Sequence, residues 1–93
     1  MMNLDTYYRL SREAVIRPER FGGLIYRYDN RRLYFLYSHD LVSFVCSIDG
    51  THPIGVALER FLANRQLPDN AYAAFVQALT QLEQLKVLIA GDT

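Results

Sequence analysis

Several features that would point to a familiar class of function are scarce in this chain of 93 residues. The single cysteine, Cys46, excludes an internal disulfide and any iron–sulfur or zinc site built from several thiolates of this chain. The two histidines, His39 and His52, have no acidic or thiol neighbours at a spacing typical of metal ligands. No apolar run approaches the roughly 18 residues of a membrane span, and the N-terminal stretch lacks the layout of a secretory signal. We therefore expect one cytoplasmic domain, residues 1–93, without a metal or another cofactor.

Motifs for catalysis are also missing. Gly22-Gly23 precedes an expected strand rather than a helix, so it does not form a phosphate-binding loop, and no nucleophile elbow is present. Cys46 lies among apolar residues of an expected helix and has no nearby base in the sequence, which favours a buried, inert thiol. These absences predict a binding protein rather than an enzyme.

The net charge is zero, but the arginines are unevenly distributed. Residues 9–32 contain seven arginines against Glu13, Glu19 and Asp29, a balance of +4, and the rest of the chain carries −4. A basic surface attracts acidic partners, whereas charged side chains on a strand edge also discourage unwanted pairing with other chains. Both interpretations of the arginines remain open at this point.

The clearest β pattern is a hairpin within residues 17–37. Residues 24–28 and 32–37 are rich in aromatic and aliphatic side chains, and they flank Asp29-Asn30, which tolerate the positive φ of a tight turn. A two-residue turn places Leu24 opposite Phe35, Ile25 opposite Tyr34, Tyr26 opposite Leu33 and Arg27 opposite Arg32. A three-residue turn would shift all of these partners, and both turns remain open. In the two-residue register the more apolar face, which we expect in the core, consists of Leu24, Tyr26, Leu33, Phe35 and Tyr37.

Other elements are expected on both sides of the hairpin. Residues 6–10 and 14–17 are short, aromatic and β-branched segments, and each predicts a strand. Ser38 predicts the N-cap of a first helix, Thr51 caps a second, and Pro68-Asp69 open a third that reaches about Lys86. Residues 87–90 either end the third helix or form a short extension. With strands within 6–37 and helices within 38–88, we expect an α+β, winged helix-turn-helix-like fold: an N-terminal three-stranded antiparallel sheet followed by a three-helix bundle.

The third helix has more apolar surface than one neighbour would cover. Its expected core-facing arc consists of Ala71, Ala74, Phe75, Ala78, Leu82 and Leu85, and the arc is widened by a flank of Tyr72, Val76 and Leu79. Two interpretations are open. The flank packs on the hairpin or the first helix, or it lines a groove beside residues 32–37 that leaves apolar surface for a ligand.

A winged helix-turn-helix fold also raises DNA binding as an alternative. The third helix, however, offers a single basic residue, Lys86, beside Asp69 and Glu83, and a neutral chain supplies little phosphate neutralisation. Single-stranded nucleic acid could stack on the tyrosines of the arginine-rich hairpin, but the same tyrosines suit half-buried sheet positions. We therefore expect no nucleic-acid partner.

Four short motifs occur in one order: YRL at 8–10, RPE at 17–19, FG at 21–22 and RRLYFLYS at 31–38. In these motifs the chain resembles the peptide-binding chaperones of mycofactocin biosynthesis, which are relatives of the pyrroloquinoline quinone chaperone. The likeness is densest over residues 8–45. It implies a non-catalytic precursor-peptide recognition element that binds the leader of a ribosomally made peptide and presents it to a radical S-adenosylmethionine maturase.

The resemblance also implies where the leader binds, namely as an added strand on residues 32–37, against the third helix. Carried over by position, the peptide-binding residues are Arg31, Arg32, Leu33, Tyr34, Phe35, Leu36, Tyr37, Tyr72, Val76, Leu79 and Glu83. Strand addition gains main-chain hydrogen bonds, and Arg27, Arg31 and Arg32 would attract acidic leader residues. The alternatives are recognition for another peptide-modifying enzyme and, without peptide, pairing of the open edge in a homodimer.

Overall fold

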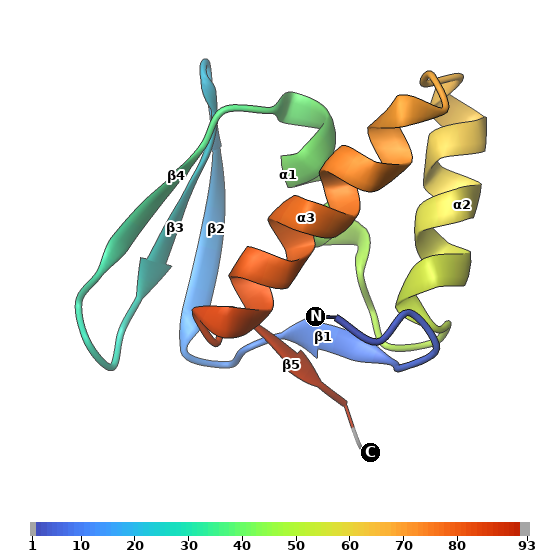
Figure 1. Cartoon of the computed structure of the whole chain (residues 1–93). Coiled ribbons are helices and arrows are strands. Elements are labelled where there is room, and N and C mark those ends of the chain that lie inside the picture. Colours follow the sequence, from blue (N-terminus) through green and yellow to red (C-terminus); the bar gives the residue numbers. More distant parts are fainter. Residues whose placement is uncertain (1, 92–93) are drawn as a thin grey trace.

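The computed structural model describes residues 2–91, which form two antiparallel sheets and three helices. Figure 1 shows the elements in chain order. They are β1 (Tyr8–Leu10), β2 (Ala14–Glu19), β3 (Gly22–Arg27), β4 (Leu33–Leu36), α1 (His39–Ser47), α2 (Ile54–Arg65), α3 (Asn70–Gln84) and β5 (Leu88–Ala90).

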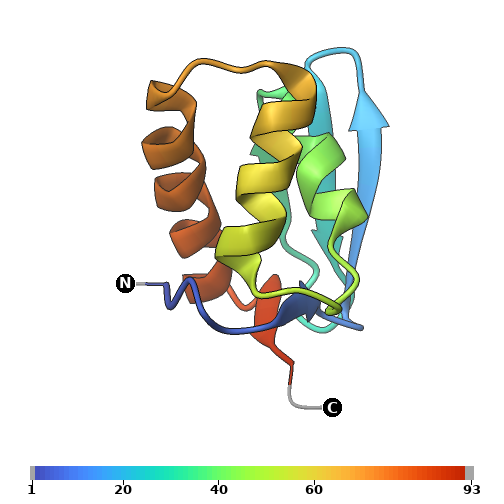
Figure 2. The same cartoon turned by 90° about the vertical axis from the view of Figure 1, so that its right-hand side faces the viewer.

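The larger sheet has the strand order β2-β3-β4. All three helices lie on one side of it, as the two views in Figures 1 and 2 show, so its other face carries no helix from the described part of the chain. Of the two registers left open by the sequence, the structure has the one expected for a two-residue turn, with Leu24 opposite Phe35, Ile25 opposite Tyr34 and Tyr26 opposite Leu33.

The turn between β3 and β4 differs from the prediction in its backbone. The residue with positive φ is Arg31, at 59°, rather than Asp29 or Asn30. The side chains of Asp29 and Asn30 instead accept hydrogen bonds from the N–H groups of Asn30 and Arg32, each at 3.0 Å. The turn therefore spans more residues than expected, although the strand register is unchanged.

The face of this sheet that packs on the helices is not the predicted one. Ile25 is fully buried, and Tyr34 and Leu36 are half-buried against the core. Leu33 and Phe35, which were expected inside, are 51% and 54% exposed. The predicted core face, which also included Leu24, Tyr26 and Tyr37, is therefore wrong. Both faces of the hairpin are rich in apolar residues, so hydrophobicity alone could not decide between them.

The first predicted strand does not join the larger sheet. β1 pairs instead with β5, Tyr8 opposite Ala90 and Leu10 opposite Leu88, in a separate two-stranded sheet. A strand thus follows the three helices, whereas the sequence predicted all strands before all helices. The α+β class and a three-stranded antiparallel sheet are confirmed, but that sheet is built from the second, third and fourth strands.

The starts of the first two helices are set differently. Ser38 caps α1 as predicted, because its Oγ accepts a hydrogen bond from the N–H of Leu41 at 3.1 Å. Thr51 does not cap α2; its hydroxyl donates to Asp49 at 2.6 Å, and α2 begins after Pro53 without a side-chain cap.

On α1, Cys46 is exposed, which corrects the expectation of a buried thiol.

The core between the sheet and the helices is centred on large side chains. Phe44 of α1, Phe61 of α2 and Phe75 of α3 pack with ring centroids 5.2–6.3 Å apart. Leu79 is fully buried at the centre of α3, whereas Ala74 and Leu85, which were expected in its core-facing arc, are exposed. The large residues, rather than the alanines, therefore determine which side of α3 faces inward.

The glycine pair at the start of β3 allows close packing on two sides. Gly22 has φ 144°, and a Cβ on it would lie 2.1 Å from the carbonyl oxygen of Leu36. A Cβ on Gly23 would lie 2.6 Å from a methyl group of Val42 in α1. These glycines let β3 approach both the end of β4 and α1.

Candidate functional site

The two edges of the larger sheet are protected to different degrees. β2 carries Pro18, which has no N–H to donate, and an exposed ion pair in which Arg17 Nε lies 2.7 Å from Glu19 Oε2. Proline and charge are the usual means by which an edge strand avoids further pairing. β4 has the sequence Leu-Tyr-Phe-Leu, with neither charge nor proline, and no other described strand pairs with its outer edge. β4 is therefore the open edge of the sheet.

The backbone groups that β4 directs toward this edge follow from the ladder. The N–H of Arg27 donates to the carbonyl of Arg32 at 3.0 Å, so these two residues form a hydrogen-bonded pair. Hydrogen-bonded and non-hydrogen-bonded pairs alternate along an antiparallel ladder. Tyr34 consequently bonds to Ile25, whereas Leu33 and Phe35 direct their N–H and C=O groups away from β3. These groups are the ones that a further strand would use.

A groove of about 380 Å³ runs between β4 and α3, and we call it the β4 groove. Its walls carry no charged side chain. From the sheet it is lined by residues 33–37, and from α3 by Ala78, Gln81, Leu82 and Leu85. An extended chain added to β4 would direct every second side chain into this groove.

The structure brings together the predicted residues of the hairpin but not those of the third helix. Leu33, Tyr34, Phe35, Leu36 and Tyr37 all line the β4 groove. The exposed residues Arg31 and Arg32 adjoin it at the turn. On the helix side, sequence reasoning missed the residues that do line the groove: Ala78, Gln81, Leu82 and Leu85.

The predicted residues of α3 lie elsewhere. Leu79 is 0% exposed in the core, and the Glu83 carboxylate accepts a hydrogen bond from the hydroxyl of Tyr8 at 2.6 Å. Tyr72 and Val76 line a separate hollow of about 570 Å³ beside Leu4. The prediction placed the alanine-rich side of α3 in the core, whereas the side with Phe75 and Leu79 is buried. The greater size of these two side chains was the signal that could have oriented the helix correctly.

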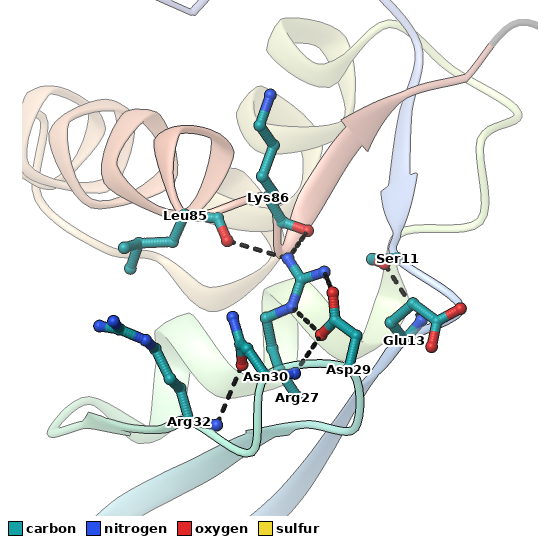
Figure 3. Close-up of polar contacts among 8 residues, drawn as sticks. All are labelled: Ser11, Glu13, Arg27, Asp29, Asn30, Arg32, Leu85 and Lys86. Atoms are coloured by element: carbon teal, nitrogen blue, oxygen red, sulfur yellow. Dashed lines mark hydrogen bonds and ion pairs between the residues drawn. The ribbon is translucent and has the colours of Figure 1, made fainter.

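A buried arginine, Arg27, connects parts of the chain on both sides of the β4 groove. Its side chain is buried, and Nη1 donates to the carbonyl oxygens of Leu85 at 3.0 Å and Lys86 at 2.7 Å. Nε and Nη2 donate to the two carboxylate oxygens of Asp29 at 3.0 and 2.7 Å, as Figure 3 shows. The guanidinium thus joins the end of α3, which contributes Leu85 to one wall of the β4 groove, to the β3–β4 turn, which leads into the strand that forms the other wall. This position corrects the expectation that Arg27 would attract an acidic peptide.

The ion pair shifts the pKa of both partners in the direction that favours their charged forms. The hydrogen bonds from Arg27 hold the pKa of Asp29 below its ordinary value, and the same contact raises the pKa of Arg27. The pKa of Asp29 is lower in the folded state than in the unfolded chain. The ionised carboxylate therefore stabilises the fold fully at pH values above the ordinary carboxyl pKa of about 4. This contribution is lost as the pH falls through the lowered pKa.

We expect Asp29→Asn to lower the free energy of unfolding at pH 7 and to reduce its decline in acid, because the variant has no carboxylate to protonate here. Urea unfolding at several pH values between 7 and 3 measures both effects. Asp5→Asn, at an exposed position, is the control for the loss of one charge. Parallel curves for Asp29→Asn and the unmodified chain over this range would contradict the role given to the ion pair.

The described residues show neither a metal site nor a membrane span. Within residues 2–91, no three His, Cys, Asp or Glu side chains are grouped so that they could hold a metal ion. None of the three helices is long and apolar enough to cross a membrane. What the described surface does offer is an unpaired strand edge beside an uncharged groove.

Comparison with known proteins gives a consistent family assignment. The model of the peptide chaperone MftB family matches residues 7–89. The peptide chaperone MftB of Mycolicibacterium smegmatis is 32% identical over 88 residues, which cover 95% of this chain and 82% of the relative. The peptide chaperone MftB of Mycobacterium ulcerans is 29% identical over the same length, with coverages of 95% and 77%. No solved structure matches significantly. The chain belongs to the peptide chaperone MftB family.

Proposed function

We propose that this protein binds the leader of the mycofactocin precursor peptide by strand addition to β4, and presents it to a radical S-adenosylmethionine maturase without catalysis of its own. The observation that carries the proposal is the open edge of β4 beside an uncharged groove. A peptide strand would bond to the N–H and C=O groups of Leu33 and Phe35, and its alternate side chains would enter the groove. The name of the relatives, peptide chaperone, agrees with such a role.

The charges near the groove favour an acidic segment in the leader. Arg31 and Arg32 are exposed at the turn end of β4, and neither forms an ion pair within residues 2–91. They would accelerate the encounter with carboxylates of the peptide, an effect that weakens with added salt. Because a disordered leader must become ordered on binding, we expect Kd on the order of nanomolar to micromolar.

The proposal also includes a cytoplasmic location. It further places the protein in the wider group of precursor-peptide recognition elements related to the pyrroloquinoline quinone chaperone, with a winged-helix-like arrangement. A homodimer that pairs two β4 edges would compete with the peptide, so it would form only in its absence. Calorimetric titration with a synthetic mycofactocin precursor peptide tests the central claim. No heat of binding at micromolar concentrations would reject the mycofactocin precursor, and binding of a different leader would favour service to another peptide-modifying enzyme.

A matched pair of charge substitutions on α3 tests which side of the helix faces the peptide. Ala78 lines the β4 groove, whereas Gln77, its neighbour in sequence, lines the hollow beside Leu4. We expect Ala78→Asp to weaken peptide binding about tenfold or more, because a carboxylate would be desolvated in the groove and would repel an acidic leader. Gln77→Asp adds the same charge and should change Kd less than twofold. Equal losses in both variants, measured by calorimetry on folded protein, would reject the groove.

A further inference from the structure

The face of the larger sheet that points away from the helices carries several large hydrophobic side chains that are exposed, and we call it the outer aromatic face. Its exposed large hydrophobic residues are Val15, Phe21, Tyr28, Leu33, Phe35 and Tyr37. Tyr37 is 76% exposed. Exposed apolar groups that adjoin one another, unlike isolated ones, mark interaction sites.

Four of these six residues lie along or against the open edge, where Leu33, Phe35 and Tyr37 also border the β4 groove. Leu33 and Phe35 belong to β4 itself, and Tyr37 follows it directly. Phe21, from the β2–β3 turn, packs on these residues, with its ring centroid 5.9 Å from that of Phe35 and 5.5 Å from that of Tyr37. The opposite edge, β2, presents the ion pair of Arg17 and Glu19 on the same face. The apolar surface is therefore displaced toward the strand that lacks a partner.

A strand added to β4 would extend this face. Side chains directly opposite one another on neighbouring strands lie on the same face, with Cβ atoms about 4.5–5.5 Å apart. Peptide residues opposite Leu33 and Phe35 would consequently point to the outer aromatic face, and the residue opposite Tyr34 would point into the β4 groove. Every side chain of the added segment would then meet an apolar wall, in alternation on the two sides of the sheet.

We infer that the edge row of the outer aromatic face, Leu33, Phe35 and Tyr37, is a second side-chain recognition surface for the bound peptide, an inference that rests on the proposed function. The ligand class it assigns is a segment of about four consecutive apolar residues, with alternate side chains against Leu33, Phe35 and Tyr37 and the others in the β4 groove. Acidic residues would flank the segment at the end near Arg31 and Arg32. A groove alone would select apolar residues only at every second position.

Other occupants fit the face less well. A second sheet stacked face to face would be centred on β3 and would desolvate the Arg17–Glu19 pair. Single-stranded nucleic acid needs open ring faces for stacking, whereas Phe21, Phe35 and Tyr37 pack against one another. A peptide strand at the edge uses both the unpaired backbone of β4 and the adjoining row of side chains.

The test combines single substitutions in the protein with a serine scan of the peptide. Phe35→Ala should weaken binding of the synthetic mycofactocin precursor peptide about threefold to tenfold in calorimetry. Val15→Ala, on the same face but on β2, should change Kd less than twofold. Leu33→Ala provides a second edge variant, and circular dichroism verifies that each protein is folded. The loss caused by Phe35→Ala should diminish when serine occupies the one or two outward peptide positions beside Phe35, and not when it occupies their neighbours.

The outcomes distinguish a failure of the second recognition surface from a failure of the proposed function. If the unmodified chain binds the peptide but Phe35→Ala and Leu33→Ala bind as tightly as Val15→Ala, the outer face takes no part and this inference is overturned alone. If the unmodified chain does not bind the peptide, the proposed function fails and the inference fails with it. Tighter binding of oligothymidine than of peptide, lost in Phe35→Ala, would assign the face to nucleic acid and also overturn it.

Discussion

Arg27→Ala should lose about 2–3 kcal/mol of unfolding free energy in urea titration, because the carbonyl groups of Leu85 and Lys86 lose the guanidinium that satisfies them. The pair with Asp29 adds little to this value, since the carboxylate is 45% exposed and can be solvated by water. Arg27→Lys should recover only part of the loss, because an ammonium group cannot reproduce the planar fork that reaches carbonyls and carboxylate together. For a domain of this size, such a loss is a large fraction of total stability.

The control for this result is Arg12→Ala, at an exposed position without an ion pair in the described part of the chain. Surface substitutions of that kind usually change stability by less than about 0.5 kcal/mol. Equal unfolding midpoints for Arg27→Ala and Arg12→Ala would show that the buried guanidinium does not hold the end of α3. A folded Arg27→Ala protein should also bind peptide more weakly, because the wall that includes Leu85 would no longer be tied to the turn.

Phe35→Pro should abolish strand addition and leave the fold intact, with peptide affinity at least about tenfold below that of Phe35→Ala. The N–H of Phe35 points to the open edge, so proline removes a donor that β3 does not use. Proline also occurs naturally on the other edge of the sheet, at Pro18 of β2. The comparison with alanine separates the lost backbone donor from the lost aromatic ring.

Tyr34→Pro is the contrasting variant. The N–H of Tyr34 faces Ile25 within the sheet, so proline at this neighbouring position should destabilise the fold itself. Urea unfolding combined with peptide calorimetry distinguishes the two cases. Peptide affinity for Phe35→Pro equal to that for Phe35→Ala would show that the backbone edge of β4 is not where the peptide binds.

Local features were predictable from the sequence because their causes lie within a few residues. The hairpin itself follows from two apolar segments separated by a short turn, although its register was left open, and the start of α1 follows from one hydroxyl at Ser38 and one N–H at Leu41. The α+β class and the presence of three helices also emerged from periodicity. The resemblance of the short motifs in residues 8–38 led to the family that the comparisons then showed.

The open edge could be proposed from the sequence, but its surroundings could not. Both faces of the β3–β4 hairpin carry apolar residues, and only the position of the helices determined that Ile25 is buried while Phe35 is exposed. The same holds for α3, where contacts with the rest of the core place Leu79 inside and leave Ala78 in the β4 groove. Such choices depend on how well large side chains fill a shared space, which no single segment encodes.

Arg27 shows the same limit for a polar residue. In sequence it is one of seven arginines between residues 9 and 32, and nothing local separates it from Arg31 or Arg32. Its partners at Leu85 and Lys86 are distant in sequence and are brought near only by folding, as are β1 and β5. The sequence by itself determined the β3–β4 hairpin, the cap of α1 and the α+β class. The tertiary structure alone decided which face lines the groove and which arginine holds it together, because burial and satisfied hydrogen bonds depend on residues far apart in the chain.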